Sequence, residues 1–226
     1  MNIKSVEQNI RLLDDELGCM GFDAAFLNIL SSRIRVGEGK DFILPFEKKF
    51  DGIPVEGLAF FELSTTEGLY RLMVFSIKLG EGSQGAIREN SFLRVRDELS
   101  LREAFNLMQG RSVYREPWFD PASEGYWISL DLVKTIAGIY PSKYLRNRFK
   151  VSKAVADSFL ARWMSWADQE RLYVELGQGA RVRVAAGPEK GSVLIEADPA
   201  GEQLRIKDWD GEATDYWYDN GFWQYR

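Results

Sequence analysis

The residues best suited to bind a charged ligand lie between Leu132 and Ala156, a stretch with six basic residues and no acidic one. Tyr140, Tyr144 and Phe149 are interleaved with them. Arginine and lysine bind phosphate and carboxylate groups, and aromatic rings stack on nucleic-acid bases. We therefore take this segment as a candidate binding surface, against the alternative of a solvated face whose aromatics anchor it to the core. Its basic residues are Lys134, Lys143, Arg146, Arg148, Lys150 and Lys153.

A second candidate surface lies at the C-terminus, where Asn220-Gly221 separates two short aromatic runs. Asn-Gly favours a two-residue type I′ turn, which pairs residues 216–219 with residues 222–225. Trp217 and Phe222 then share one face of the hairpin, because residues paired or alternating in this way lie on the same side.

One face of this hairpin is expected to pack on helices around Trp163 and Trp166. The other face is expected to form an exposed apolar patch, a feature that often marks a partner site. The alternative is that the whole hairpin lies in the core, where aromatic clusters are common.

Histidine is absent from the chain, and cysteine occurs once, at Cys19. Histidine is the side chain best placed to transfer protons near neutral pH, and it is the commonest metal ligand. Its absence excludes Ser-His-Asp and Cys-His catalysis and the usual zinc and iron sites. We therefore expect a non-catalytic protein that uses no cofactor and no metal ion.

Carboxylate pairs catalyse hydrolysis without histidine, so a carboxylate-dependent hydrolase stays open as an alternative. The acidic candidates lie beside predicted helix caps, on polar helix faces or in turns, which are positions typical of solvated acids. They are Asp14, Asp15, Glu16, Asp97, Glu98 and Glu124.

Two short motifs resemble ligand sites but lack the context that such sites need. Gly80–Gly85 matches G-x-G-x-x-G, yet the residues after it alternate like a strand, whereas a dinucleotide site requires a helix there. Asp208–Gly211 resembles part of a calcium loop, but Ile206 and Trp217 stand where oxygen ligands are required. Both motifs are predicted to be turns.

The chain has 226 residues and a formal net charge of -5, from 29 basic and 34 acidic residues. This weak acidity disfavours a surface that coats nucleic acid or an anionic membrane, so we expect a protein partner ahead of nucleic acid. The N-terminus lacks the apolar core of a signal peptide, and no run is long enough to span a membrane. With a single cysteine, nothing implies an oxidising compartment, and we expect a cytoplasmic protein without membrane contact.

Two helices are predicted at the N-terminus. The first begins at a capping box formed by Ser5 and Gln8 and is expected to stop at Gly18. The second is expected to run from about Asp23 to Arg35, with Gly37 beyond it.

An antiparallel meander of four strands is predicted next. Apolar and polar residues alternate in the first strand, and Asp51-Gly52 after it is typical of a two-residue hairpin turn. The four strands are expected at about residues 42–50, 53–61, 69–79 and 86–95.

After the meander, Ser100-Leu101-Arg102-Glu103 forms a second capping box that opens a short helix, which Gly110 ends. Two strands are expected at about residues 111–115 and 126–132. Together these elements form a first α+β unit over residues 1–134.

Residues 135–226 are predicted to form a second α+β unit. Ser152 and Ser165 are expected to cap two helices, and Gly177 to end the second. Three short strands are then expected at residues 181–185, 192–197 and 203–209, ahead of the aromatic hairpin.

The stretches Leu101–Val113 and Trp127–Asp131 resemble a family of uncharacterised bacterial proteins often encoded near conjugation and mobilisation genes. Gly21-Phe22 and the meander from Phe42 add to this resemblance, which covers roughly residues 20–210. It implies a packing pattern and a mobile-element context, and it supplies no activity and no site residues.

Within the segment from Ile136 to Lys153 the chain departs from this family. Its members tend to be more polar there and often hold a histidine, so a shared site in this segment is not implied.

These observations predict an α+β fold with two units, residues 1–134 and 135–226, each built of helices followed by an antiparallel meander. The expected function is a non-catalytic binding module, an accessory protein of a mobile genetic element, that contacts a protein partner. A single-stranded nucleic-acid binder using residues 134–153 and a carboxylate-dependent hydrolase are the alternatives. The candidate contact residues are Lys143, Tyr144, Arg146, Arg148, Lys150, Lys153, Trp217 and Phe222.

Overall fold

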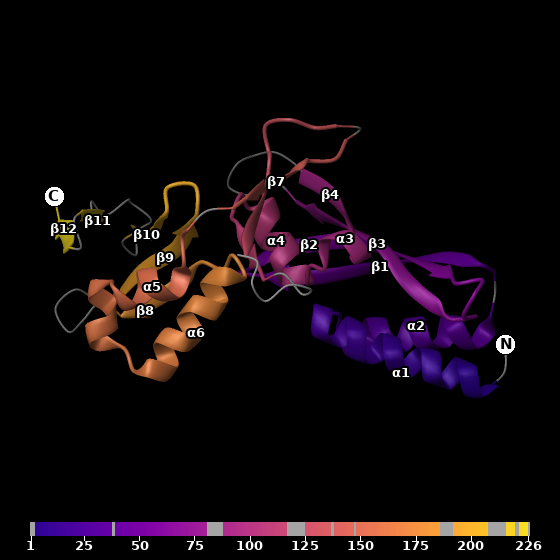
Figure 1. Cartoon of the computed structure of the whole chain (residues 1–226). Coiled ribbons are helices and arrows are strands. Elements are labelled where there is room, and N and C mark those ends of the chain that lie inside the picture. The colour runs from indigo at the N-terminus through magenta and orange to yellow at the C-terminus, as the bar shows by residue number, and fades with distance from the viewer. Residues whose placement is uncertain are drawn as a thin grey trace. The chain divides into compact units, whose positions relative to one another are not determined.

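A computed structural model describes residues 3–37, 39–80, 88–116, 125–136, 138–146, 148–185, 192–207, 216–219 and 222–225, the last two ranges by their backbone. The architecture is α+β with antiparallel sheets, as predicted (Figure 1). By their contacts the residues form two compact units. The first comprises Met1–Met108 with Thr135–Ile139, and the second comprises Gln109–Lys134 with Tyr140–Arg226.

The first unit opens with two helices, α1 (Ile3–Met20) and α2 (Ala24–Val36). Helix α2 confirms its predicted ends. The N–H of Phe26 donates to Oδ1 of Asp23 at 2.9 Å, and Gly37 closes the helix with a left-handed φ of 69°. Both contacts satisfy backbone groups that a helix end leaves without partners.

Helix α1 differs from its predicted bounds at both ends. It begins at Ile3, so Ser5 lies inside the helix, and it continues past Gly18 to Met20. The chain reverses instead at Gly21, where φ is 95°. There the N–H of Phe22 donates to the carbonyl of Leu17 at 2.9 Å, and the N–H of Gly21 donates to the carbonyl of Gly18 at 3.0 Å. The helix therefore ends at Gly21, the glycine that adopts the left-handed conformation, and not at Gly18.

Four strands form the predicted meander, in the order β1-β2-β3-β4, with every neighbouring pair antiparallel. Phe50 pairs with Ile53 across Asp51-Gly52, whose φ angles of 50° and 82° confirm the two-residue turn. The strands are β1 (Asp41–Phe50), β2 (Ile53–Leu63), β3 (Tyr70–Leu79) and β4 (Arg88–Leu93).

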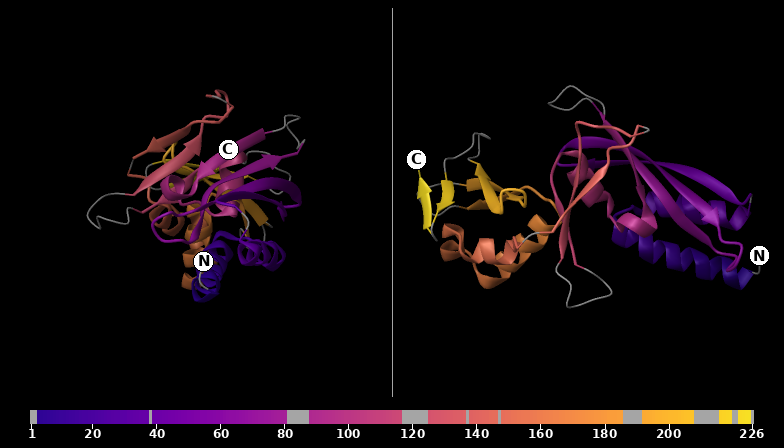
Figure 2. Two further views of the ribbon diagram at one scale, coloured as in Figure 1. Left: turned by 90° about the vertical axis from the view of Figure 1, so that its right-hand side faces the viewer. Right: turned by 45° about the horizontal axis from the view of Figure 1, so that its top comes forward.

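Helices α1 and α2 lie along one face of this sheet (Figure 2). On β1 that face carries buried Phe42 and Phe46, whereas Ile43 between them is 57% exposed. The ring centroids of Phe22 and Phe46 lie 5.0 Å apart, and those of Phe26 and Phe61 lie 6.4 Å apart. The core of the first unit is therefore an aromatic layer between helix and sheet, produced by the alternation in β1.

Two short helices follow the meander, α3 (Arg94–Asp97) and α4 (Leu101–Met108). The predicted capping box at the start of α4 is confirmed. The N–H of Ser100 donates to Oε2 of Glu103 at 2.8 Å, and the N–H of Glu103 donates to Oγ of Ser100 at 3.2 Å.

The second unit starts with a three-stranded sheet in the order β5-β6-β7. Strands β5 (Val113–Arg115) and β6 (Tyr126–Leu130) were predicted, with slightly longer bounds. Strand β7 (Ser142–Leu145) was not predicted, and it pairs with β6 through Trp127–Leu145 and Ser129–Lys143.

Three helical segments and a second sheet complete this unit. The helices are α5 (Val151–Ala156), the 3₁₀-helix η1 (Phe159–Trp163) and α6 (Trp166–Gly177). The sheet has the order β10-β9-β8, with β8 (Val182–Ala185), β9 (Ser192–Asp198) and β10 (Gln203–Lys207).

Ser165 caps α6 as predicted, because its side chain accepts the N–H of Asp168. The predicted cap at Ser152 is wrong. Helix α5 begins one residue earlier, at Val151, and Lys150 at its N-cap makes no side-chain capping bond.

The expected division after residue 134 also differs from the contacts. Residues 109–134 group with the second unit, because β6 pairs with β7 and Trp127 packs beside Phe149, with ring centroids 5.7 Å apart. The second unit therefore opens with strands rather than with a helical pair.

The predicted C-terminal hairpin is present as β11 (Tyr216–Asp219) and β12 (Phe222–Tyr225), with Tyr218 opposite Trp223 and Tyr216 opposite Tyr225. Several predicted features lie outside the described residues: the Asn220-Gly221 turn, most of the Gly80–Gly85 motif, the Asp208–Gly211 motif and Glu124. Among the helices that the structure describes, none combines the length and the apolar character needed to cross a membrane.

Candidate partner-binding site

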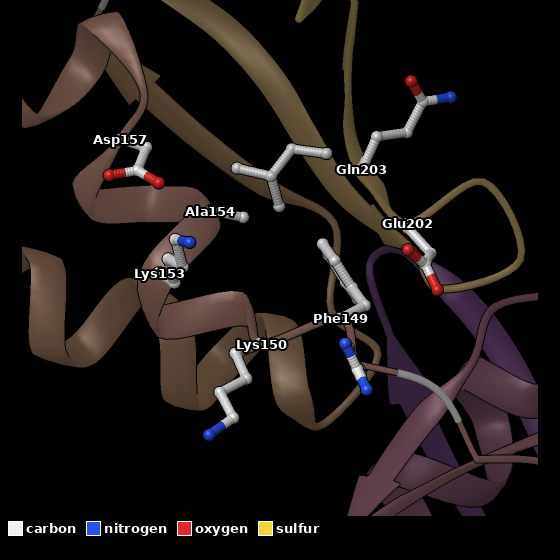
Figure 3. A pocket seen from close by; sticks show the side chains of 9 residues that line it. Phe149, Lys150, Lys153, Ala154, Asp157, Glu202 and Gln203 are labelled. Atoms are coloured by element: carbon white, nitrogen blue, oxygen red, sulfur yellow. The ribbon is translucent and has the colours of Figure 1, made fainter. Parts of the chain in front are cut away.

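A pocket of about 170 Å³ lies between the start of α5 and the turn that joins β9 to β10 (Figure 3). We call it the α5 pocket. It brings together Arg148, Lys150 and Lys153 of the predicted basic segment with residues about fifty positions later in the chain. Its lining residues are Arg148, Phe149, Lys150, Lys153, Ala154, Asp157, Glu202, Gln203 and Leu204.

The floor of the α5 pocket is apolar and fixed. Phe149 is 7% exposed and Leu204 is 3% exposed, and both belong to the core cluster of the second unit. Phe149 packs against Trp127 behind it. Arg148 and Lys150, on either side of Phe149 in the chain, are exposed, because successive side chains of an extended segment point in opposite directions.

The three basic side chains are available to a ligand. Arg148, Lys150 and Lys153 are all exposed, and none of them forms an ion pair with any residue that the structure describes. Helix α5 turns its apolar side, with Val151 and Val155, to the core, which leaves Lys153 at the rim. These cations are therefore not neutralised within the described part of the unit.

The opposite rim is held by a turn organised around Asp198. This carboxylate is 8% exposed. Its Oδ1 accepts the N–H of Gly201 at 3.2 Å, and its Oδ2 accepts Nε of Arg205 at 2.9 Å. The turn places Glu202 at the pocket with a left-handed φ of 52°, a conformation that a residue other than glycine adopts only when its surroundings hold it.

The pocket therefore has mixed charge. Three cations face two acids, Asp157 and Glu202, over an apolar floor. Such a site suits a group with an apolar body and an anionic end, since the body covers Phe149 while the charge reaches the basic rim.

Lys143 does not line this pocket and has a partner of its own. Its Nζ lies 3.0 Å from Oδ2 of Asp131. The hydrogen bond from Lys143 lowers the pKa of the Asp131 carboxyl, more than desolvation raises it. Lys143 is therefore a structural contact between β7 and the end of β6.

Tyr144 and Arg146 form a separate, exposed part of the basic segment. Tyr144 is 53% exposed on β7, and its ring centroid lies 5.9 Å from that of Tyr126. Arg146 is exposed and does not line the α5 pocket. Lys134 is also exposed and lies outside it.

The predicted sites at the C-terminal hairpin are described only in their pairing. Trp217 lies opposite Gln224, and Phe222 lies opposite Asp219. Trp163 and Trp166 are 60% and 75% exposed, and the expected packing of one hairpin face on the helices around them stays a prediction, because the hairpin side chains lie outside the described part of the structure.

Sequence reasoning missed the far wall of the pocket. This wall is formed by Glu202, Gln203 and Leu204, and nothing in their spacing to the basic segment indicates that they meet it. The turn itself is local, because β9 and β10 pair as a hairpin, but it meets the basic segment only because α5 packs against β10, about fifty residues later in the chain.

Two of the six acidic candidates for hydrolysis have structural partners. Oε1 of Glu16 accepts Nε of Arg94 at 2.8 Å, and Oδ2 of Asp97 accepts the N–H of Leu93 at 2.8 Å.

In the described part of the chain, no group of three or more acidic or cysteine side chains is arranged to hold a metal ion. No protein-family model, curated protein or solved structure matches the chain. The resemblance to conjugation-associated proteins stays a prediction from the sequence. The α5 pocket is the site that brings the predicted basic residues together over an apolar floor.

Proposed function

We propose that the chain is a non-catalytic binding module that contacts an acidic segment of a protein partner through the α5 pocket. One observation carries this proposal. Arg148, Lys150 and Lys153 surround the buried Phe149 and form no ion pair with any residue that the structure describes. An aspartate or glutamate flanked by apolar residues supplies the negative charge that pairs with the basic rim and the apolar surface that covers the apolar floor.

A protein ligand fits the pocket better than nucleic acid does. Asp157 and Glu202 on the rim repel a phosphate backbone, which carries charge at every nucleotide. An acidic peptide places its charge at chosen positions and can direct neutral or basic groups at the two acids. The net charge of -5 acts in the same direction, because long-range repulsion slows the approach of a polyanion.

Peptide selection tests the proposal even while the partner is unidentified. A displayed library of short random peptides is selected on the full chain and then depleted on R148E/K150E/K153E. The selected peptides are expected to be rich in aspartate and glutamate beside apolar residues. Their affinity is expected to be about tenfold lower for the triple variant, a modest loss because each exposed ion pair contributes little. Their affinity for the wild type is expected to fall as the salt concentration rises.

The matched control is K40E/K49E/R162E, which changes the net charge equally at exposed basic residues outside the pocket. It is expected to leave binding unchanged at physiological salt. Selected peptides without acidic residues, or equal losses in the two triple variants, would contradict the proposal.

Single-stranded nucleic acid is the second candidate ligand, and Tyr144 is the observation that favours it. An exposed tyrosine next to Tyr126 can stack on a base, with Arg146 close in sequence to contact phosphate. The probe is a labelled single-stranded oligonucleotide titrated at low salt. Binding that falls steeply with salt and is lost in both Tyr144→Ala and Arg146→Ala would support this candidate, while Lys49→Ala serves as the control.

We further propose that this binding module serves a mobile genetic element as an accessory protein. The support is the resemblance of residues 100–131 to conjugation-associated proteins. Deletion of the gene is expected to lower the transfer frequency of the element that carries it. Complementation with the wild type but not with R148E/K150E/K153E would link transfer to the α5 pocket.

A further inference from the structure

The sheet of the second unit has an open edge at β8. Its strand order is β10-β9-β8, and in the described part of the chain β8 pairs only with β9. In an antiparallel pair, alternate residues direct their N–H and C=O groups away from the partner strand. The outer edge of β8 is therefore a row of main-chain donors and acceptors, which is what an added strand recognises.

A groove runs beside this edge. It has a volume of about 420 Å³ and lies between β8 and the segment from η1 to α6. Val182 and Val184 form one wall, and Leu172 of α6 lies in the other. We call this site the β8 groove; it is lined by Trp163, Met164, Asp168, Arg171, Leu172, Glu175, Val182, Arg183, Val184 and Ala185.

An exposed tryptophan stands at the end of the groove. Trp163 lines it and is 60% exposed, and Trp166, three residues later, is 75% exposed. Neighbouring exposed tryptophans are costly to leave in water and are the residues most enriched among those that dominate protein interfaces. Trp163, which lines the groove, gives a ligand there an aromatic anchor.

The two walls of the groove differ in their charged side chains. Asp168, Arg171 and Glu175 follow one face of α6 at spacings of three and four residues. Nη2 of Arg171 bonds Oδ1 of Asp168 at 3.0 Å, whereas Glu175 forms no ion pair with any described residue. The helix side of the groove therefore keeps an acid, whereas Arg183 on the strand side already donates from Nε to Oγ of Ser192 at 2.9 Å.

From this geometry we infer that the β8 groove binds an extended segment of a protein partner, which adds to the sheet as a strand beside β8. The charges specify its pattern. Residues that point into the groove are apolar, next to Leu172 and Val184, with a basic one toward Glu175.

This inference goes beyond the function proposed for the α5 pocket and does not depend on it. The pocket recognises a charged side chain, whereas the β8 groove recognises main chain in an extended conformation. The two sites share no lining residue. A partner can therefore use either one alone.

The experiment uses short random peptides selected on the full chain and then depleted on Trp163→Ala. Selected peptides are expected to alternate apolar and polar residues and to lose about tenfold or more in affinity in Trp163→Ala. The matched control is Val174→Ala, which removes another half-exposed apolar side chain of the same region outside the groove and is expected to leave affinity unchanged.

Peptides N-methylated at single positions test the main-chain pairing. Methylation at every second position is expected to abolish binding, and methylation at the positions between is expected to have little effect, because only alternate N–H groups face β8. Equal effects at all positions would overturn the inference.

Hydrogen exchange supplies a readout that side-chain contacts alone do not change. Outward amides of β8 are expected to exchange rapidly in the free chain and slowly in the complex. Slow exchange along the whole of β8 in the free chain would show that the edge is already covered. The cover is a second copy if the protection rises with protein concentration, and another part of the same chain if it does not. Either result would overturn the inference.

The variant R148E/K150E/K153E separates this inference from the α5 pocket. It is expected to bind the groove-selected peptides as the wild type does. A loss of binding in that variant would assign these peptides to the α5 pocket and refute the β8 site.

Discussion

The indole ring of Trp127 and the phenyl ring of Phe149 lie 5.7 Å apart at an interplanar angle of 32°. This contact joins the middle of β6 to the basic segment that precedes α5. It holds the backbone there so that Phe149 faces the core while Arg148 and Lys150 face solvent. The aromatic contact thus positions the cations of the α5 pocket.

Removing this contact is expected to destabilise the second unit. Phe149→Ala deletes a buried ring and leaves a cavity beside Trp127, so we expect the free energy of unfolding to fall by about 3–5 kcal/mol. Phe149→Leu retains most of the buried volume and is expected to cost clearly less. Urea denaturation followed by tryptophan fluorescence measures both variants.

Tyr144→Ala is the control, because it truncates an aromatic residue of the same segment that is 53% exposed. Its effect is expected to stay within about 0.5 kcal/mol, as for most surface substitutions. A Phe149→Ala variant as stable as Tyr144→Ala would show that the ring does not anchor the segment.

Much of the first unit could be predicted because its signals are local. Asp51-Gly52 between alternating runs fixes a hairpin within four residues, and Asp23 and Gly37 mark the ends of α2 through hydrogen bonds to their neighbours. Each of these features depends on residues that are adjacent in sequence. The same holds for the capping box at Ser100 and Glu103.

Strand β7 and the far wall of the α5 pocket could not be predicted, for a different reason. Ser142–Leu145 is short and follows Pro141, and it is extended because β6 supplies its hydrogen-bonding partner. Glu202 reaches the pocket because α5 packs against β10, a contact between residues about fifty positions apart in the chain. Long-range contacts determine both features, and local propensity does not encode them.

The capping box is expected to contribute measurably to the stability of the first unit. Ser100→Ala removes the acceptor for the N–H of Glu103 at the start of α4, so the free energy of unfolding should fall by about 1 kcal/mol. Ser100→Gly should cost only a few tenths of that, since glycine suits the N-cap backbone. Chemical denaturation of both variants tests this, and equal losses would point to the side-chain packing of Ser100 instead.

The ion pair between Lys143 and Asp131 is expected to make stability depend on pH. Lys143 holds the pKa of Asp131 below its ordinary value, so the pair stabilises the fold above the pKa of the unfolded state. That contribution is lost as the pH falls through the lowered pKa. Lys143→Met should therefore unfold at lower urea than the wild type at neutral pH, and the two midpoints should converge in acid.

NMR titration of the Asp131 carboxyl carbon provides the direct check. Its pKa should lie below the ordinary aspartate value in the wild type and rise in Lys143→Met. Lys134→Met serves as the control, because Lys134 acts on Asp131 only through weaker charge attraction. The same pKa in all three proteins would mean that the Lys143 bond is absent in solution.

Gly57 and Gly18 should respond in opposite directions to the same substitution. Gly57 lies opposite Phe46 in the sheet, and a Cβ there would collide with the Phe46 ring and with the carbonyl oxygen of Ser76 on β3. Gly57→Ala is therefore expected to destabilise the first unit by about 1–3 kcal/mol, as in overpacked cores.

Gly18 lies inside α1 with nothing within 4 Å of such a Cβ, so Gly18→Ala should stabilise by about 0.5–1 kcal/mol through helix propensity. Thermal and urea denaturation of the two variants measure both signs, and a Gly57→Ala protein at least as stable as the wild type would show that the Phe46 ring moves aside at little cost.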